Sequence, residues 1–581
     1  MISARLSPRS PPSGPVSLPA RPSPSTEENL VLTKNQSAKS ATMDGGAAVV
    51  AWLKAVGVQN IFSVSGGPIN SVYRACAHQG LPLIHARHEA AACFMAEAQS
   101  RVTGKAGAAV VTLGPGVTNA VTPGLVAMLA GTPVIIVGAQ AGTKSAERGA
   151  GMAYDVLPIM KGVTKWAARC TDPNRLQEYL DIAWRKMWAG RPGPVFLEVP
   201  TDILSTPLST EVASACPPMP GIAGVPARDA DAARTLLAQA KRPLLVLGDE
   251  LFWDRTDRIT EVVEKHGLAF ATMRLARGIV DERHPRWMGP AYAPCNATLR
   301  RAMKEADCIL LLGHHFEFDL EFGDTVGQDA RIIQVCSDQE LLHRNKQADI
   351  AIAASPAAFL DVVAEMSPLQ IDRLWSDGLV TAWQSERESQ LGEGDATGIH
   401  PVAAIDAVSA AAPDNAIFVT SHGNIDFWAD ARLRVPAVGR YLRAGQSGAL
   451  GAEVPYGAGA CFADPDAPVI VFVGDGGVGF HISELDTAER YGRAFIIVVL
   501  DDEMWGAIAL PQEQSFGETY EMNLPRRDWA KVAEGLGGRG YFARDADAIQ
   551  KALADAIASG KPALIQVPVR SVISPYMAYI S

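Results

Sequence analysis

Two aspartates, Asp475 and Asp502, each follow a short apolar segment in the last quarter of the chain. The stretch from Val469 to Gly506 reads VIVFV, GDGGVGF, HISELDTAERYG, AFIIVVL and DDEMWG, which predicts a strand, a crossover helix and a parallel strand. Both strands of such a unit end at the same edge of the sheet, so the two carboxylates are expected to meet there. They would repel each other unless a hard divalent cation such as Mg2+ lay between them.

The glycines of this stretch add a second requirement. Backbone N–H groups of Gly476 and Gly477 at a helix start favour a phosphate, so a metal-bridged diphosphate satisfies both features. Residues 474–479 also spell GxGxxG, and Asp501 ends the next strand, as in the dinucleotide-binding fingerprint. Asp475 would then bring a negative charge to the pyrophosphate, which is costly without a metal. The residues favour the metal-diphosphate interpretation and leave dinucleotide binding, or a structural turn, as alternatives.

The composition excludes several classes of function. A formal net charge of −11, from 52 basic and 63 acidic residues, and no concentrated basic stretch argue against a nucleic-acid partner. No run reaches the roughly 18 uninterrupted apolar residues of a membrane span, so no membrane partner is expected. Eight cysteines without a CxxC pair indicate a reducing compartment, and a cytoplasmic location is the expectation.

The remaining chain divides by composition. Residues 1–42 are rich in Ser and Pro, so a disordered segment is expected, and its Arg and Ser bias leaves import into an organelle open. From there, apolar strands alternate with helical stretches, which predicts an α/β protein with mostly parallel, doubly wound sheets. The expected domains and tail span residues 43–205, 229–370, 398–570 and 571–581. A proline-rich linker is expected from residue 205 to about 228, and a second linker is expected around Ser376 to Thr397.

The last of these domains carries a specific resemblance. GDG, a Glu ten residues after its first glycine (Glu484), and a strand that ends in an acid pair before WG resemble the thiamine diphosphate motif of the acetolactate synthase-like superfamily. The segments RHEAAA, TNAVTP, TKWA, ELDT and WGA are similar to the benzaldehyde lyase, oxalyl-CoA decarboxylase and 2-hydroxyacyl-CoA lyase branch. The resemblance implies three α/β domains, which are a pyrimidine-binding, a central and a diphosphate-binding domain.

The resemblance also implies roles for individual residues. Mg2+ would be held by Asp475, Asp502 and the backbone carbonyl of Met504. Glu89 would be the catalytic acid that activates the coenzyme's aminopyrimidine, although an acid at a helix start also complements the helix dipole. The candidate cofactor-binding residues are Glu89, Gly423, Asn424, Gln446, Leu450, Gly474, Asp475, Gly476, Gly477, Asp502, Met504 and Trp505. The candidate substrate residues are His88, Gly114, His422 and His481.

The implied activity is cleavage or formation of a carbon-carbon bond next to a carbonyl, with thiamine diphosphate and Mg2+. The partners would be a small carbonyl substrate and further copies of the chain, in a homodimer or homotetramer. Four positions differ from relatives: Asp501, Pro68, Gly151 and Glu453, and the sequence offers no reason for the last. These differences keep a catalytically altered regulatory paralogue open, alongside a NAD-dependent oxidoreductase.

Overall fold

The computed structural model describes residues 43–208, 224–420 and 422–575, which form three parallel six-stranded sheets. In the first sheet the strand order is β2-β1-β3-β4-β6-β5. Its strands are β1 (Ile61–Ser63), β2 (Leu83–His85), β3 (Gly107–Val111), β4 (Val134–Gln140), β5 (Trp166–Arg169) and β6 (Val195–Pro200). Its helices are α1 (Gly45–Ala55), α2 (Asn70–Gln79), α3 (Glu89–Thr103), α4 (Pro115–Thr118), α5 (Val121–Ala130), α6 (Leu157–Val163), α7 (Leu176–Trp188) and α8 (Thr201–Ser205).

The second sheet has the order β12-β11-β10-β7-β8-β9. Its strands are β7 (Pro243–Leu247), β8 (Phe270–Thr272), β9 (Trp287–Pro290), β10 (Cys308–Leu312), β11 (Arg331–Cys336) and β12 (Ile350–Ala353). Its helices are α9 (Ala227–Gln239), α10 (Leu251–Asp254), α11 (Arg258–His266), α12 (Ala297–Glu305), α13 (Pro356–Ala364) and α14 (Arg373–Ser389). Helix α14 occupies most of the stretch expected to be the second linker, because Leu379 and Trp383 give it a buried face.

The third sheet has the order β14-β13-β15-β16-β18-β17. Its strands are β13 (Ile417–Val419), β14 (Tyr441–Leu442), β15 (Val469–Gly474), β16 (Ile496–Asp501), β17 (Arg539–Phe542) and β18 (Ala563–Pro568). Its helices are α15 (Pro401–Ala411), α16 (Asn424–Arg432), α17 (Glu453–Ala463), α18 (Asp475–Val478), α19 (Glu484–Arg490), α20 (Gly506–Phe516), α21 (Trp529–Gly535) and α22 (Ala546–Ser559).

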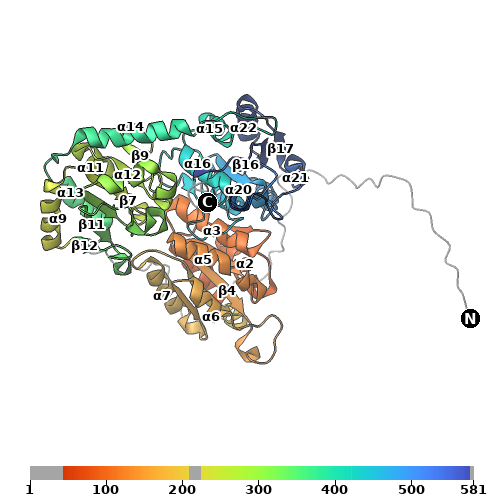
Figure 1. The fold of residues 1–581 in the computed structure, drawn as a ribbon. Helices are drawn as coiled ribbons and strands as arrows, with labels where there is room; N and C mark the ends of the chain where they lie inside the picture. Colours follow the sequence, from red (N-terminus) through yellow and green to blue (C-terminus); the bar gives the residue numbers. More distant parts are fainter. Residues whose placement is uncertain (1–42, 209–223, 421, 576–581) are drawn as a thin grey trace, which may run out of the picture. The chain divides into compact units, whose positions relative to one another are not determined.

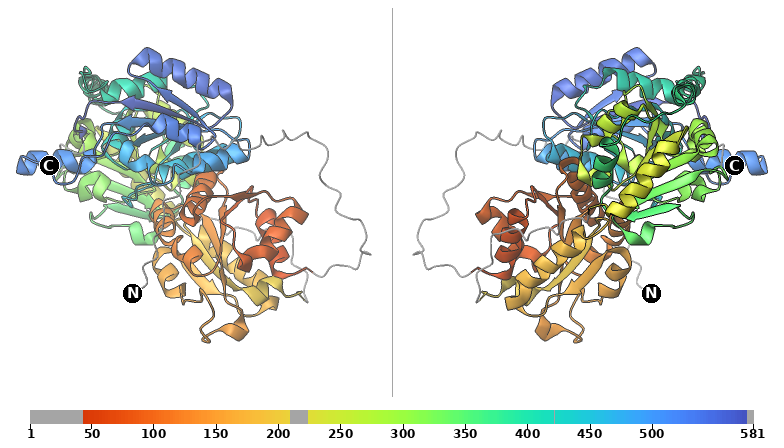
Figure 2. Two further views of the ribbon diagram at one scale, coloured as in Figure 1. Left: turned by 90° about the vertical axis from the view of Figure 1, so that its right-hand side faces the viewer. Right: turned by 90° about the vertical axis from the view of Figure 1, so that its left-hand side faces the viewer.

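The predicted fold class is confirmed. Every pair of neighbouring strands is parallel, and Figures 1 and 2 show helices packed around the sheets, which are coloured orange, green and blue. The central strands β3, β10 and β15 read GAAVV, CILLL and VIVFVG and are almost wholly buried, as expected for sheets covered on both faces. The expected disorder of residues 1–42 and most of the expected tail, from residue 576 on, lie outside the described residues.

Helix α3 of the first domain packs against the third domain. Its buried side chains belong to the same hydrophobic core as those of α17 and β15. The two helices approach closely at Gly459, where a Cβ would lie 2.6 Å from the backbone of Met95. A glycine is required at this crossing, which fixes the direction of α3 and therefore the position of its first residue, Glu89.

Within the described ranges, no helix has both the length and the apolar character needed to cross a membrane.

Candidate active site

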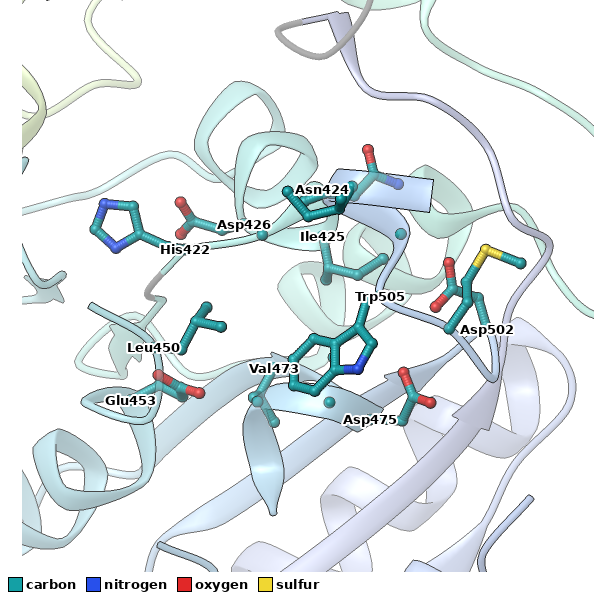
Figure 3. Close-up of a pocket in the computed structure, with 18 of the residues that line it drawn as sticks. His422, Asn424, Ile425, Asp426, Leu450, Glu453, Val473, Asp475, Asp502 and Trp505 are labelled. Carbon is teal, nitrogen blue, oxygen red and sulfur yellow. The ribbon is translucent and has the colours of Figure 1, made fainter. Parts of the chain in front are cut away.

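The two predicted metal-binding aspartates lie at one edge of the third sheet. Strands β15 and β16 pair in parallel, with Gly474 opposite Leu500, so both strands end at the same side. Asp475 begins helix α18 and Asp502 directly follows β16. A cavity of about 250 Å³ opens at this edge, and both aspartates line it. Figure 3 shows Asp475 and Asp502 toward one end of the cavity and His422, Leu450 and Glu453 toward the other.

Most of the predicted cofactor-binding residues line this cavity together. They come from the starts of α16 and α18, the loop before α17 and the turn after β16. The set is Gly423, Asn424, Leu450, Gly474, Asp475, Gly476, Gly477, Asp502, Met504 and Trp505, and the predicted substrate residue His422 lines the cavity as well. Residues separated by more than 80 positions in the sequence therefore form one wall.

Burial and mutual repulsion disfavour the ionised forms of the two aspartates when no cation is present. Burial raises the pKa of Asp475 to about 8, and the nearby Asp502 and Asp501 carboxylates add to the rise. Burial likewise raises the pKa of Asp502 to about 7, although a hydrogen bond from Ser571 Oγ opposes this, at 3.2 Å. Asp475 Oδ1 is buried without a hydrogen-bond partner among the described residues. A divalent cation would stabilise both ionised carboxylates and satisfy that oxygen.

The negative charge of Asp501 does not add a third ligand to the cavity. Its carboxylate is buried and accepts hydrogen bonds from Gln566 Nε2, at 2.6 Å, and from the N–H of Glu503, at 3.3 Å. Glu503 itself has a φ of +56°, in the left-handed region that a non-glycine residue rarely adopts. The turn after β16 therefore contains a strained residue, as is common at functional sites, and its two neighbours, Asp502 and Met504, line the cavity.

Two helix starts face the cavity from different strands. Gly423, with a φ of +138°, precedes α16, and Gly474 precedes α18. The side chain of Asn424 is engaged elsewhere, since it donates to the Val572 carbonyl at 2.7 Å and accepts from the Ser574 N–H at 2.8 Å. The backbone N–H groups at the two helix starts are consequently the groups of this wall that are free to bind an anion.

The glycines of the loop make space for two larger side chains. A Cβ at Gly476 would lie 2.5 Å from the ring of Trp505. A Cβ at Gly477 would lie 2.6 Å from Oε1 of Glu453. Packing therefore favours glycine at positions 476 and 477 of the GDGG sequence, whereas Gly474 has open space around it.

Comparison with known proteins identifies the chemistry of this cavity. The family model for the C-terminal TPP binding domain of thiamine pyrophosphate enzymes matches residues 421–567. The models for their N-terminal TPP binding domain and their central domain match residues 43–159 and 230–363. A protein named 2-hydroxyacyl-CoA lyase 2 from Homo sapiens is 30% identical over 584 residues, which cover 91% of this chain and 90% of that protein. The chain belongs to the thiamine diphosphate-dependent enzymes of the acetolactate synthase-like superfamily.

Two further relatives show the range of this family around the chain. A protein named 2-hydroxyacyl-CoA lyase 2 from Bos taurus is 29% identical over 581 residues, covering 91% of this chain and 90% of that protein. A protein named probable acetolactate synthase from Mycobacterium bovis is 28% identical over 536 residues, covering 91% of this chain and 96% of that protein. The chain is therefore a thiamine diphosphate-dependent lyase or transferase that acts on small molecules and makes or breaks carbon-carbon bonds. The family match decides against the dinucleotide interpretation of GxGxxG.

The residues of the cavity fit this coenzyme. The buried, unpartnered oxygen of Asp475 suits a magnesium ion, and the two helix starts suit a diphosphate. Among the described residues, no cluster of three or more His, Cys, Asp or Glu side chains is arranged to hold a metal. Two carboxylates alone would leave a magnesium ion short of ligands, so a backbone carbonyl such as that of Met504 and the oxygens of the diphosphate would be needed.

Several other predicted residues of this thiamine diphosphate-dependent enzyme lie outside the cavity. Glu89 belongs to the first domain, where its Oε2 accepts a hydrogen bond from Asn119 Nδ2 at 2.9 Å. Gly114 precedes α4 in the same domain. Gln446 contacts Glu317 and lines a second cavity, of about 330 Å³, together with His314.

The two remaining histidines have structural partners. His88 precedes α3, and its Nδ1 accepts a hydrogen bond from the N–H of Ala90 at 3.1 Å. The ring of His481 lies 5.6 Å from that of His88, and its Nδ1 lies 2.8 Å from the carbonyl oxygen of Gly451. Both rings therefore contribute to holding the start of α3 against the third domain.

Glu484, which the motif contains but the site prediction did not include, has a direct link to the segment before Glu89. Its carboxylate is fully buried and accepts hydrogen bonds from the N–H of Arg87, at 3.0 Å, and from Thr487 Oγ1, at 2.6 Å. Arg87 lies two residues before Glu89. Because Glu484 lies ten residues after Gly474, its hydrogen bond links the segment that begins with the Asp475 loop to the helix that carries Glu89.

Two acidic residues of the cavity wall were not among the predicted site residues: the sequence analysis missed Asp426 and noted Glu453 without giving it a role. Asp426 is buried in α16 and pairs with Arg443 at 2.6 Å. Glu453 is buried at the first position of α17, beside Leu450 and Gly477. The signal for Glu453 was its presence in a segment of small and apolar residues, SGALGAEVPYGAGA, where a charged side chain needs a special position.

Proposed function

We propose that the protein is a Mg2+-dependent carbon-carbon lyase or carboligase, whose substrate is a 2-hydroxyacyl compound, a 2-hydroxy ketone or a 2-oxo acid. The observation that carries the proposal is the buried pair of Asp475 and Asp502, facing two helix starts in one cavity. The names of the relatives, 2-hydroxyacyl-CoA lyase 2 and acetolactate synthase, support these substrate classes.

When bound, thiamine diphosphate supplies a carbanion that attacks a carbonyl group and then serves as an electron sink. In this proposal Asp475, Asp502 and the Met504 carbonyl hold Mg2+, and the N–H groups at the starts of α16 and α18 bind the diphosphate. Leu450, in the cavity wall, packs against the coenzyme and keeps water away from it.

Glu89 completes the site from a second copy of the chain. Its carboxylate, held by Asn119, would share a proton with a ring nitrogen of the coenzyme's pyrimidine when the coenzyme is bound. Glu89 is absent from the lining of its own chain's cavity, which supports an assembly where one subunit provides Glu89 and the other the metal loop. A homodimer is the smallest assembly with this property.

The direct test is an assay panel with thiamine diphosphate and Mg2+. Pyruvate, benzoin and a 2-hydroxyacyl-CoA represent the three substrate classes. Glu89→Gln should keep coenzyme binding and lose turnover by about 10²- to 10⁴-fold, as expected for an acid-base residue. Coenzyme binding with no turnover on any substrate would favour the regulatory paralogue instead.

A second test addresses the shared site. Glu89→Gln and Asp475→Asn should each be inactive alone. After mixing and subunit exchange, about a quarter of the wild-type activity should return, because half of the dimers are mixed and each has one intact site of two. If both residues act within one chain, mixed dimers contain no intact site and activity stays absent.

A further inference from the structure

A third cavity, lined by charged side chains, lies between the central and C-terminal domains, away from the coenzyme cavity. Its volume is about 480 Å³. It is formed by the ends of α14 and α16, by α15 and by loops of both domains. Four arginines and two aspartates line it, namely Arg283, Arg387, Arg432, Arg434, Asp406 and Asp414. We call it the arginine cavity.

The two aspartates are each paired with one arginine. Asp406 accepts two hydrogen bonds from Arg432, at 3.0 and 2.5 Å. Asp414 accepts one from Arg283, at 3.0 Å. Their charges are therefore balanced, and no carboxylate of the lining is left for the other two arginines.

Arg387 and Arg434 have no such direct partner, although the charge of Asp406 acts on Arg387 from a distance and opposes the lowering of its pKa. Within the described part of the chain neither forms an ion pair, and the Nε of each is buried without a hydrogen-bond partner. Arg387 donates only to the Arg432 carbonyl, at 2.8 Å, and Arg432 donates in return to the Arg387 carbonyl, at 2.6 Å. Burial, and next the charges of Arg432 and Arg434, lower the pKa of Arg387 to about 10.

These two arginines lower the stability of the folded protein when no ligand is bound. Partly buried guanidinium groups without a counterion lose hydration and repel one another. The reciprocal bonds between Arg387 and Arg432 cap the ends of two helices and fix both side chains in place. The cavity therefore presents two positive charges without an ion-pair partner, those of Arg387, whose side chain is held in place, and of the neighbouring Arg434.

We propose that the arginine cavity binds a small phosphorylated compound, with its phosphate between Arg387 and Arg434. A phosphate dianion matches the two uncompensated charges, and planar guanidinium groups bind phosphate oxygens in pairs. The rest of the cavity is lined by Pro413, Pro436 and Ala410, which leaves room for a less polar part of the ligand.

The proposal is tested with inorganic phosphate on the enzyme saturated with thiamine diphosphate and Mg2+, so that the coenzyme cavity is filled. Thermal unfolding is followed as phosphate replaces chloride at constant ionic strength. We expect a saturable rise in Tm for the wild type, as for any ligand that binds only the folded state. Arg434→Gln and Arg387→Gln should weaken binding by about tenfold or more. Arg539→Gln, on exposed strand β17 outside the cavity, is the matched control and should behave as the wild type.

Whether Arg434→Gln raises or lowers Tm should depend on phosphate. Without it, Arg434→Gln should raise Tm, because the substitution removes an uncompensated charge; at saturating phosphate its Tm should fall below that of the wild type. An equal phosphate response in wild type, Arg434→Gln and Arg539→Gln would overturn the proposal. A saturable response to succinate with none to phosphate would also overturn it. Equilibrium dialysis of labelled phosphate should give one site per wild-type chain, and no bound phosphate would refute the assignment even if a variant failed to fold.

Discussion

Glu97 offers a sharp test of the buried contact between α3 and α17. It lies two turns beyond Glu89 on α3 and is 1% exposed. Its carboxylate accepts hydrogen bonds from Tyr456 Oη, at 2.8 Å, and Thr132 Oγ1, at 3.1 Å. Glu97→Gln keeps the shape of the side chain and removes its titration.

The magnitude follows from the pKa of Glu97. Burial raises it from 4.5 to about 7, although the bonds from Tyr456 and Thr132 and the charge of Arg101 oppose the rise. The folded state therefore binds the proton more tightly than the unfolded state. The stability contributed by protonated Glu97 is fully present below pH 4.5 and is lost as the pH rises through 7. The total loss is on the order of 3 kcal/mol.

The assay compares urea unfolding of wild type and Glu97→Gln between pH 5 and pH 8, in EDTA and without coenzyme. The difference in unfolding free energy should shift in favour of the variant by about 2 to 3 kcal/mol over this range. Other titrating groups affect both proteins equally and cancel in the difference. Glu388→Gln, at an exposed position of α14, should show no such shift. If the unfolding free energies of wild type and Glu97→Gln changed in parallel with pH, the raised pKa of Glu97 would be refuted.

Three further predictions concern the site and its support. Asp475→Asn should abolish the Mg2+-dependent rise in Tm that thiamine diphosphate gives the wild type, and EDTA should have the same effect on the wild type. Glu484→Met should lower kcat about tenfold or more with little change in coenzyme affinity, because the Arg87 N–H loses its buried acceptor and the start of α3 shifts. Gly459→Ala should lower the urea-unfolding free energy by about 1 to 3 kcal/mol, since its Cβ meets the backbone of α3, whereas Gly535→Ala, with open space around it, should not.

The position of Asp475 and Asp502, the proposed metal-binding pair, could be predicted from sequence alone. Parallel strands joined by a helix end at the same sheet edge, so the spacing of two apolar runs already placed Asp475 near Asp502. The same rule applies to the start of α16, which follows the neighbouring strand β13. Residues whose place depends on strand order were therefore located correctly within the cavity.

Residues placed by loops were less predictable. Gln446 and Leu450 lie on one loop, yet only Leu450 lines the coenzyme cavity. The glycines at 445 and 448 have φ values of +60° and +69°, so the loop turns between the two residues and directs Gln446 toward Glu317. Glu453 faces the coenzyme cavity because α17 is held there by its contact with α3, a long-range packing effect with no local pattern.

The link between Glu484 and Arg87 has a consequence for how two sites would work together. Glu484 follows Asp475 on one segment and is the buried acceptor for the Arg87 N–H, and Asp486 on the same helix also pairs with Arg87. A shift of the loop that carries Asp475 would therefore reach the residues just before Glu89. In the proposed dimer, Asp475 serves one site while Glu89 of the same chain serves the other. Filling one site would then restrain the catalytic acid of its neighbour. Coenzyme binding is expected to be cooperative in the wild type and independent in Glu484→Met, and identical binding curves would show that this contact carries no coupling.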